Sequence, residues 1–98
     1  MPRIVGRIDT PNSSKYLQQL CKHFGHKISV EHDTHSGHAR FSMGSARLTA
    51  DDQTLTVEFP SIGSEDIPTA HDVIDRHLEK FAFRENITGL NWSPPTSG

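Results

Sequence analysis

The chain of 98 residues has little cysteine and few large aromatic side chains: one cysteine, one tryptophan and one tyrosine. The single cysteine, Cys21, excludes an internal disulfide and a cysteine-rich zinc site. No apolar run approaches the roughly 18–20 residues that span a bilayer, and residues 1–7 lack the apolar core of a signal peptide. We therefore expect a soluble, cytoplasmic protein that does not bind membranes.

An excess of charge of one sign is also missing, since the formal net charge at pH 7 is −2. This balance argues against a nucleic-acid-binding protein, which normally presents a strongly basic surface. The chain has no glycine-rich phosphate-binding loop and no nucleophile elbow, so the common nucleotide-binding and hydrolase motifs are excluded. What the chain does have is histidine, with seven residues of this type.

The apolar residues recur with the periods of regular secondary structure. Residues 4–8 alternate as in a short strand, and residues 87–92 predict a last strand. Apolar positions at helical spacing predict a first helix that ends near Gly25 and a second, longer helix over residues 65–83. The stripe of the first helix is formed by Leu17, Leu20, Cys21 and Phe24, and that of the second by Ile67, Ala70, Val73, Ile74, Leu78 and Phe81.

Between the two helices, apolar and polar residues alternate as in β-hairpins. A two-residue turn at 36–37 would place His32 and Phe41 opposite each other on the apolar face. The same register would bring Asp33, His35 and His38 together on the outer face.

A second hairpin, formed by residues 46–50 and 54–59, places Arg47 opposite Glu58 on the outer face. The apolar positions change parity before this hairpin, which predicts a bulge or break at residues 44–45. The resulting element order is βαβββαβ. It predicts an α+β fold, a two-layer sandwich in which two helices cover one face of a mostly antiparallel sheet of about five strands. We expect one domain over residues 1–92 and a disordered tail over 93–98, which holds no apolar residue.

His77 is the most informative of the histidines, because it lies inside the apolar stripe of the second helix. One interpretation is a buried, neutral imidazole that is hydrogen-bonded to a neighbour. The other is a metal ligand or a proton carrier. His32, which the hairpin pattern also directs inward, would be a partner for His77 if the two rings meet; otherwise it is solvated at the end of the sheet.

A basic, histidine-containing segment follows the stripe of the first helix. We predict that a ligand-binding corner forms from the ends of both helices if the helices pack antiparallel or side by side. One reading of the histidines is a metal site for Zn or Fe at His23, His26 and His77; another is that the cationic residues only neutralise the helix dipole. The predicted ligand-binding residues are Lys22, His23, His26, Lys27, His77 and Arg84.

Asp33, His35 and His38 form an alternative surface metal site, because two imidazoles and one carboxylate hold Zn, Ni or Cu. The competing interpretation is that they are solvated turn residues. Cys21 lies on the apolar stripe and is assigned to the core, since the helix C-terminus disfavours a reactive thiolate. The sequence assigns no catalytic residue.

Residues 16–27 and 76–85 resemble a small bacterial family, the domain of unknown function 2218, and the resemblance covers residues 6–92. This family also occurs attached to siderophore-interacting proteins, which are flavin-dependent reductases. The resemblance implies a bacterial cytoplasmic protein associated with iron acquisition, with such a reductase or an iron–siderophore complex as its partner. The stretches that match the family contain His23, Phe24, His26, Lys27, His77, Phe81, Phe83 and Arg84.

Three functions are consistent with these observations. The favoured hypothesis is a non-enzymatic binding module in iron or siderophore handling. The first alternative is a homodimerising or interaction domain, because short edge strands and an exposed sheet face invite pairing. The second is a small enzyme with a histidine-centred acid–base site at His77.

Overall fold

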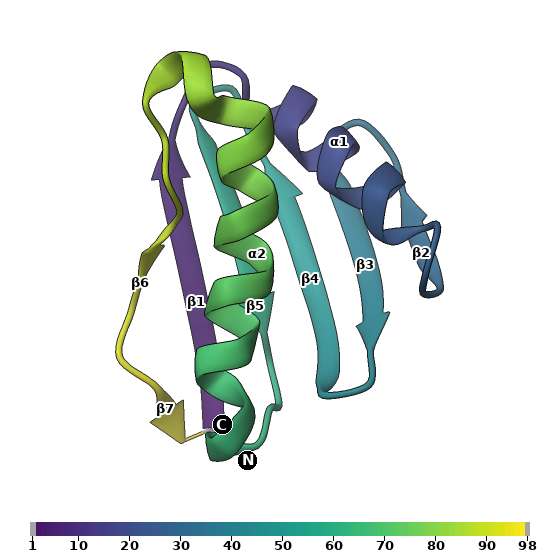
Figure 1. The fold of residues 1–98 in the computed structure, drawn as a ribbon, viewed down its shortest axis with the longest axis vertical. Coiled ribbons are helices and arrows are strands. Elements are labelled where there is room, and N and C mark those ends of the chain that lie inside the picture. The colour runs from purple at the N-terminus through teal and green to yellow at the C-terminus, as the bar shows by residue number, and fades with distance from the viewer. Residues whose placement is uncertain (1, 98) are drawn as a thin grey trace.

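The computed structural model describes residues 2–97 (Figure 1). One α-helix follows the first strand, and a second α-helix follows the fifth strand. The helices are α1 (Ser13–Phe24) and α2 (Ile67–Ala82), and α2 is flanked by the 3₁₀ turns η1 (Ser64–Asp66) and η2 (Phe83–Glu85). The strands are β1 (Pro2–Asp9), β2 (Val30–His32), β3 (Ser36–Phe41), β4 (Gly44–Ala50), β5 (Thr54–Phe59), β6 (Asn91–Trp92) and β7 (Thr96–Ser97).

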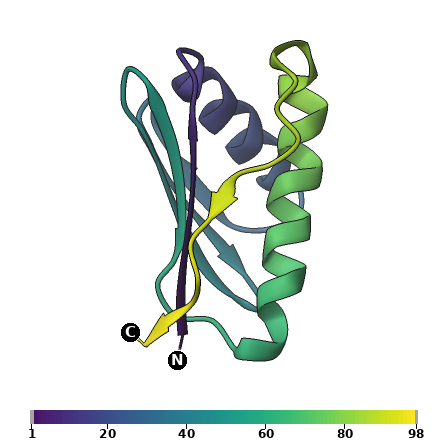
Figure 2. The same ribbon diagram turned by 90° about the vertical axis from the view of Figure 1, so that its left-hand side faces the viewer.

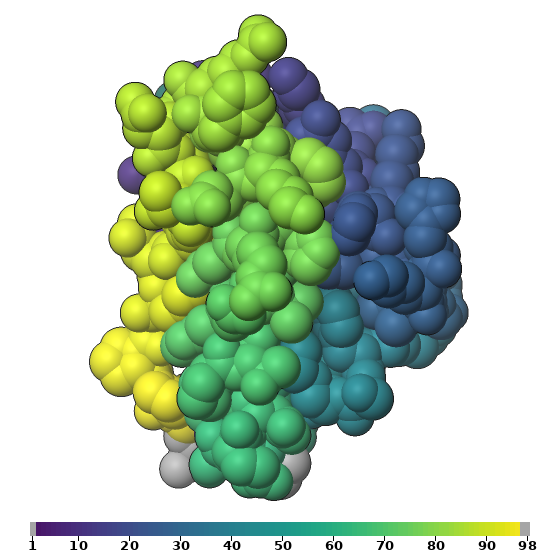
Figure 3. Space-filling view, in the orientation of Figure 1, coloured from purple at the N-terminus to yellow at the C-terminus, as the bar shows by residue number. Residues whose placement is uncertain are grey.

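The strands form one antiparallel sheet in the order β2-β3-β4-β5-β1-β6, and β7 also pairs with β1. Both helices cover the same face of this sheet, and the other face is left open (Figure 2). Figure 3 shows that α2 lies between the C-terminal segment and the α1 side of the molecule. The predicted α+β two-layer fold is confirmed, and the sheet has more strands than the five expected.

The core lies between the sheet and the helices because both contribute apolar stripes of the predicted period. Each stripe residue of α1 is buried, and so are Ala70, Ile74 and Leu78 of α2. They pack against inward-facing residues of the sheet such as Leu48, Val57 and Phe59. Burial of one such leucine or isoleucine stabilises the fold by about 1.5–3 kcal/mol. Of the described helices, none has the length and apolar character needed to cross a membrane.

The register of the first hairpin differs from the prediction by four residues. Val30 pairs with Ala39 and His32 pairs with Gly37, so the turn lies at residues 34–35 rather than 36–37. Asp33 fixes this turn, because its Oδ1 accepts hydrogen bonds from the backbone N–H groups of His35 and Ser36, both at 2.8 Å. A shift by an even number of residues keeps every side chain on its face, so the predicted inward and outward sets survive.

The predicted break at residues 44–45 is instead a tight turn at residues 42–43, which separates β3 from β4. The change of parity therefore marks a reversal of the chain, and four strands rather than three lie between the helices. Gly44 makes the reversal feasible: its φ is +143°, and a Cβ there would lie 2.7 Å from the carbonyl oxygen of Ser61. The second hairpin has the predicted register, with Arg47 opposite Glu58.

The C-terminal segment runs beside β1. Only Asn91–Trp92 of the predicted last strand is a strand, β6. Within the tail expected to be disordered, the backbone of β7 pairs Thr96 with Arg3. Gly98 and Met1, which fall in the predicted tail and domain, lie outside the described residues.

Candidate functional site

The two helices pack in opposite directions, and this arrangement decides which predicted residues meet. The side chain of Glu85, just after α2, binds Thr10 and Asn12 before the start of α1. Farther along α1, the ring of His23 lies 4.4 Å from that of His77 and 6.2 Å from that of Phe81, measured between ring centroids. The C-terminal end of α1 therefore lies against the middle of α2.

The predicted corner includes Arg84, which follows α2 in the 3₁₀ turn η2. Its neighbour in the chain, Glu85, binds Thr10 and Asn12 before the start of α1. The guanidinium carbon of Arg84 lies 5.8 Å from the ring centroid of the exposed Phe83. Arg84 is not among the residues that line the cavity at the end of α1, and its place beside the basic residues that follow α1 stays a prediction.

His23, Lys27 and His77 do come together, and they line one cavity of about 250 Å³ between α1, α2 and β3. The remaining lining is apolar and includes Phe24 and Phe41, whose rings meet edge to face at 5.1 Å. Ile28 and Val73 complete the wall. The result is an apolar cavity with three basic nitrogen groups at its edge, which is the usual composition of a small-molecule site.

The hydrogen bonding of His77 fixes which of its ring nitrogens is free. Its Nδ1 lies 2.6 Å from the carbonyl oxygen of Val73. A carbonyl only accepts, so Nδ1 carries a proton and Nε2 is the nitrogen that remains to bind a ligand or a proton. This arrangement combines the two interpretations of His77: the ring is hydrogen-bonded to a neighbour, as a structural histidine would be, and it still presents a reactive nitrogen.

The surroundings of His23 favour its neutral form. Burial lowers the pKa of His23 from its ordinary value of 6.5, and the nearby His77, Lys27, Lys80 and His26 lower it further. Each of these four groups is a base, and no acidic side chain is among the described residues that line the cavity. An anion in the cavity would supply a compensating negative charge.

Besides Arg84, two of the predicted ligand residues lie outside this cavity. Lys22 and His26 line a neighbouring hollow of about 400 Å³ together with His32, which is exposed on β2. His32 therefore takes the solvated position at the end of the sheet. Cys21 also borders this hollow but is buried, and burial raises the pKa of its thiol to about 11, as expected for a core cysteine.

Neither predicted metal site is assembled. Over residues 2–97, no three His, Cys, Asp or Glu side chains gather closely enough to hold a metal ion. His23 and His77 form a pair that His26 does not join. The expected pairing of His35 with His38 is wrong, because the shifted turn places His38 opposite Glu31 and Arg47 instead.

Sequence reasoning missed a polar cluster at the other end of the helix pair. The carboxylate of Glu85 accepts hydrogen bonds from the hydroxyls of Tyr16 and Thr10 and from the Asn12 amide. These bonds, Tyr16 first, lower the pKa of Glu85, while burial and the Glu85 contact raise the pKa of Tyr16 to about 12. The contacts span about 70 residues of sequence, so no local pattern could have revealed them.

A second missed cluster attaches the C-terminal segment to α2. Asp75 accepts hydrogen bonds from the indole N–H of Trp92, at 3.0 Å, and from the backbone N–H of Leu90, at 2.9 Å. The ring of His71 stacks on Trp92 with centroids 4.4 Å apart. Gly6 of β1 leaves room for the indole, since a Cβ there would lie 2.8 Å from it.

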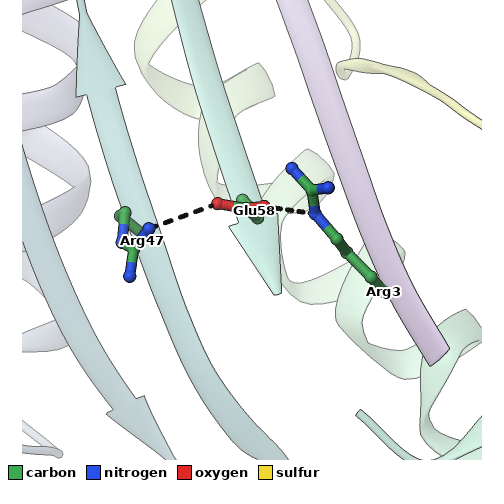
Figure 4. Close-up of polar contacts among 3 residues, drawn as sticks. All are labelled: Arg3, Arg47 and Glu58. Atoms are coloured by element: carbon green, nitrogen blue, oxygen red, sulfur yellow. Dashed lines mark hydrogen bonds and ion pairs between the residues drawn. The ribbon is translucent and has the colours of Figure 1, made fainter. Parts of the chain in front are cut away.

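The open face of the sheet carries a charge cluster centred on Glu58 (Figure 4). Its carboxylate contacts the guanidinium groups of Arg3 on one side and Arg47, at 3.7 Å, on the other. The side chain of Glu58 is only 16% exposed, whereas the arginines are 50% and 66% exposed. Cross-strand charge pairing of this kind stabilises the sheet and gives no reason to infer a ligand site.

The comparisons with known proteins support the fold and the family. A solved structure, "NMR structure of PA4090 from Pseudomonas aeruginosa", matches with a TM-score of 0.79 and 27% sequence identity, covering 99% of this chain and all of that one. No curated protein matches the sequence significantly. The family model described as "Uncharacterized protein conserved in bacteria (DUF2218)" matches residues 5–93. This chain therefore belongs to the DUF2218 family of bacterial proteins.

Proposed function

We propose that this protein is a non-enzymatic binding module whose site is the cavity between α1, α2 and β3, and that its ligand is a small acid built on a single ring. The observation that carries the proposal is the pair of imidazoles, His23 and His77, in contact inside an otherwise apolar cavity. Lys27 supplies a third basic group at the same wall.

The volume of the cavity limits the size of the ligand. An apolar cavity of about 150 Å³ holds a benzene molecule. The cavity here, at about 250 Å³, therefore accommodates one ring with a carboxylate but excludes a complete siderophore. Phe24 and Phe41 favour an aromatic ring over an aliphatic one, because their edge-to-face arrangement extends readily to a third ring.

The charge at the edge of the cavity sets the sign of the ligand. His23, His77 and Lys27 offer donors or positive charge, and each group that shifts the pKa of His23 lowers it. A carboxylate bound there would form charge-assisted hydrogen bonds in an apolar environment, where such bonds are strong. A neutral ligand of the same shape would gain only the apolar contacts.

The proposal includes the iron or siderophore handling implied by the family resemblance. Hydroxylated benzoic acids are iron-chelating units of catecholate siderophores, and they fall within the proposed ligand class. One such ring, free or as one arm of a siderophore, is the part that would enter the cavity. A partner reductase would then meet the protein at the mouth of the cavity.

Calorimetric titration of the full chain with benzoate and with benzamide tests the proposal. From the small size of benzoate we expect a Kd of about 0.1–1 mM, with benzamide at least tenfold weaker. The variant His23→Gln/His77→Gln should lose the preference for benzoate, whereas His38→Gln, on the opposite face of the sheet, should keep it. Equal binding of both compounds, or binding of neither, would refute the proposal.

Titration with 2,3-dihydroxybenzoate, alone and with Fe(III), tests the link to iron separately. Binding of the free compound at least as tight as that of benzoate supports the link. If hydroxylation weakens binding tenfold or more, the cavity binds another acid and the iron assignment fails.

A second candidate function is general acid–base catalysis, and the tautomer of His77 is the observation in its favour. Nδ1 donates to the carbonyl oxygen of Val73, so Nε2 is the nitrogen of His77 that is left to accept a proton, beside His23, whose pKa is lowered. This function predicts that phenylpyruvate, a single-ring acid with an acidic C–H bond, exchanges deuterium in D₂O faster with the protein than with His77→Gln. Equal exchange rates would rule out catalysis by His77 and leave ligand binding as the proposed function.

A further inference from the structure

We propose that the cavity binds its acid together with one proton, which the rings of His23 and His77 share between them. The inference rests on the proposed function and adds how pH controls the site. It means that both rings are neutral in the empty cavity and that one imidazolium pairs with the carboxylate in the occupied cavity.

The geometry of the two rings limits the site to one added proton. Their centroids are 4.4 Å apart and their planes are inclined by 46°. Two imidazolium charges at this separation would repel each other strongly in an apolar cavity. A single imidazolium beside a neutral imidazole avoids this repulsion, so the two rings take up one proton between them.

The groups around the pair explain why the proton is absent until the acid arrives. Those that influence His23 are His26 and Lys27, which follow in the chain, and His77 and Lys80 from α2. From β3 the cavity receives the uncharged Phe41. Since the neighbours from both helices are bases, the empty site disfavours a further positive charge, in agreement with the lowered pKa of His23.

A bound carboxylate reverses this balance. Its negative charge favours the imidazolium, so the pKa of the pair rises on binding. At a pH between the two pKa values, each binding event takes one proton from the solvent. No covalent bond to the acid forms; the proton adds to a ring nitrogen such as Nε2 of His77, because Nδ1 of that ring already holds a proton for Val73.

Proton uptake makes the affinity depend on pH in a defined direction. By linkage, the affinity for the anion falls as pH rises above the pKa of the empty pair, by up to tenfold per unit for one proton. Benzoate is an excellent probe, because it stays ionised between pH 5.5 and 8. Any change of affinity over this range therefore reports the protein rather than the probe.

Calorimetry with benzoate in two buffers of different ionisation enthalpy, phosphate and Tris, measures the uptake at pH 7.5 directly. We expect between about 0.5 and 1 proton per benzoate, and a loss of affinity of at least threefold from pH 6.5 to 7.5. His38→Gln should behave like the unaltered protein. His23→Gln/His77→Gln should bind with a heat that is the same in both buffers, and its thermal melting confirms that it is folded.

The outcomes separate this inference from the proposed function. If benzoate binds in preference to benzamide, but with the same heat in both buffers and the same Kd at pH 6.5 and 7.5, the proton-linked mechanism is overturned and the binding site stands. If benzoate does not bind at either pH, both fall together. Uptake that persists in His23→Gln/His77→Gln would assign the proton to another group and also overturn the inference.

Discussion

The two ends of the contact between α1 and α2 use polar groups in opposite ways. At the N-terminal end of α1, Glu85 accepts hydrogen bonds from three side chains, and the buried Tyr16 is one of the donors. At the other end, His23 and His77 meet in an apolar cavity. Within residues 2–97, the only hydrogen bond of either ring to the protein is the one from Nδ1 of His77. A satisfied cluster fixes a structure, whereas an open one is available for a ligand.

The position of the histidines on the helix pair therefore matters more for the candidate site than their number. Of the seven histidines, the two whose rings meet beside Lys27 in the apolar cavity form the candidate site. His35 lies in an exposed turn, His38 is exposed on β3, and His71 stacks against Trp92.

The largest expected effect on stability comes from removing Glu85, which accepts the hydrogen bonds at the N-terminal end of α1. Tyr16 is 3% exposed, and Glu85→Ala leaves its hydroxyl without an acceptor. We therefore expect a loss of about 2–3 kcal/mol in the free energy of unfolding. Urea unfolding measures this loss. Glu79→Ala, at an exposed position of α2, is the control, with an expected change of about 0.5 kcal/mol or less. Equal effects of the two changes would show that the Glu85 cluster is not structural.

The open end should respond in the opposite way. His23→Leu adds an apolar side chain to an apolar wall, so we expect the free energy of unfolding to change by about 1 kcal/mol or less. The affinity for benzoate should nevertheless fall at least tenfold, because the leucine offers no donor. A loss of stability as large as that of Glu85→Ala would instead make His23 part of the structural core.

A smaller effect is expected at the C-terminal segment, where the hydrogen bonds that Asp75 accepts from Trp92 and Leu90 form a second fully bonded cluster. Asp75→Asn keeps an acceptor oxygen for Trp92 and Leu90 but removes the charge, so we expect a loss of about 1 kcal/mol. Fluorescence of Trp92, the only tryptophan, follows the unfolding. Asp72→Asn, an exposed position on the same helix, should be neutral, and equal losses would contradict a role for Asp75 in holding the segment.

The two ends should also lose stability in different pH ranges. The pKa of His23 is lowered from 6.5, so its neutral form stabilises the fold above that value and the contribution is lost as pH falls below it. The pKa of Glu85 is lowered from 4.5, so the stability that its carboxylate contributes is still present in the pH range where His23 acts. That stability is lost only as pH falls below about 4.5.

Thermal melting between pH 3 and 8 separates these ranges. His23→Gln should flatten the dependence between pH 7 and 5, and Glu85→Gln should flatten it below pH 4.5. If His23→Gln instead flattened the dependence below pH 4.5, or Glu85→Gln flattened it between pH 7 and 5, the assignment of the two pH ranges to these groups would be contradicted.

The sequence predicted the helices, the faces of the strands and the second hairpin well, because periodicity is a local property. It misplaced the first hairpin by four residues, since Asp33 favours a turn at residues 34–35 that competes with the Ser36–Gly37 signal. An even shift preserves the faces, which explains how the fold class survived this error.

The candidate site was predicted only in part. His23, Lys27 and His77 follow from composition and helical spacing, but their neighbours depend on the direction in which the helices pack. Arg84 does not line the cavity, and its role as a ligand residue stays a prediction. Phe41 was correctly placed on the inward face, yet its contact with Phe24 in the cavity wall is a tertiary contact that no local pattern encodes.

The most direct test of the central claim is an NMR titration of the histidine side-chain nitrogens of the full chain with benzoate at pH 7. We expect saturable shifts of His23 and His77, an Nδ1-protonated His77 before and after binding, and unchanged signals of His35 and His38. Shifts confined to His26 and His32, or no saturable shift at any histidine, would contradict the assignment of the site to the cavity between α1, α2 and β3.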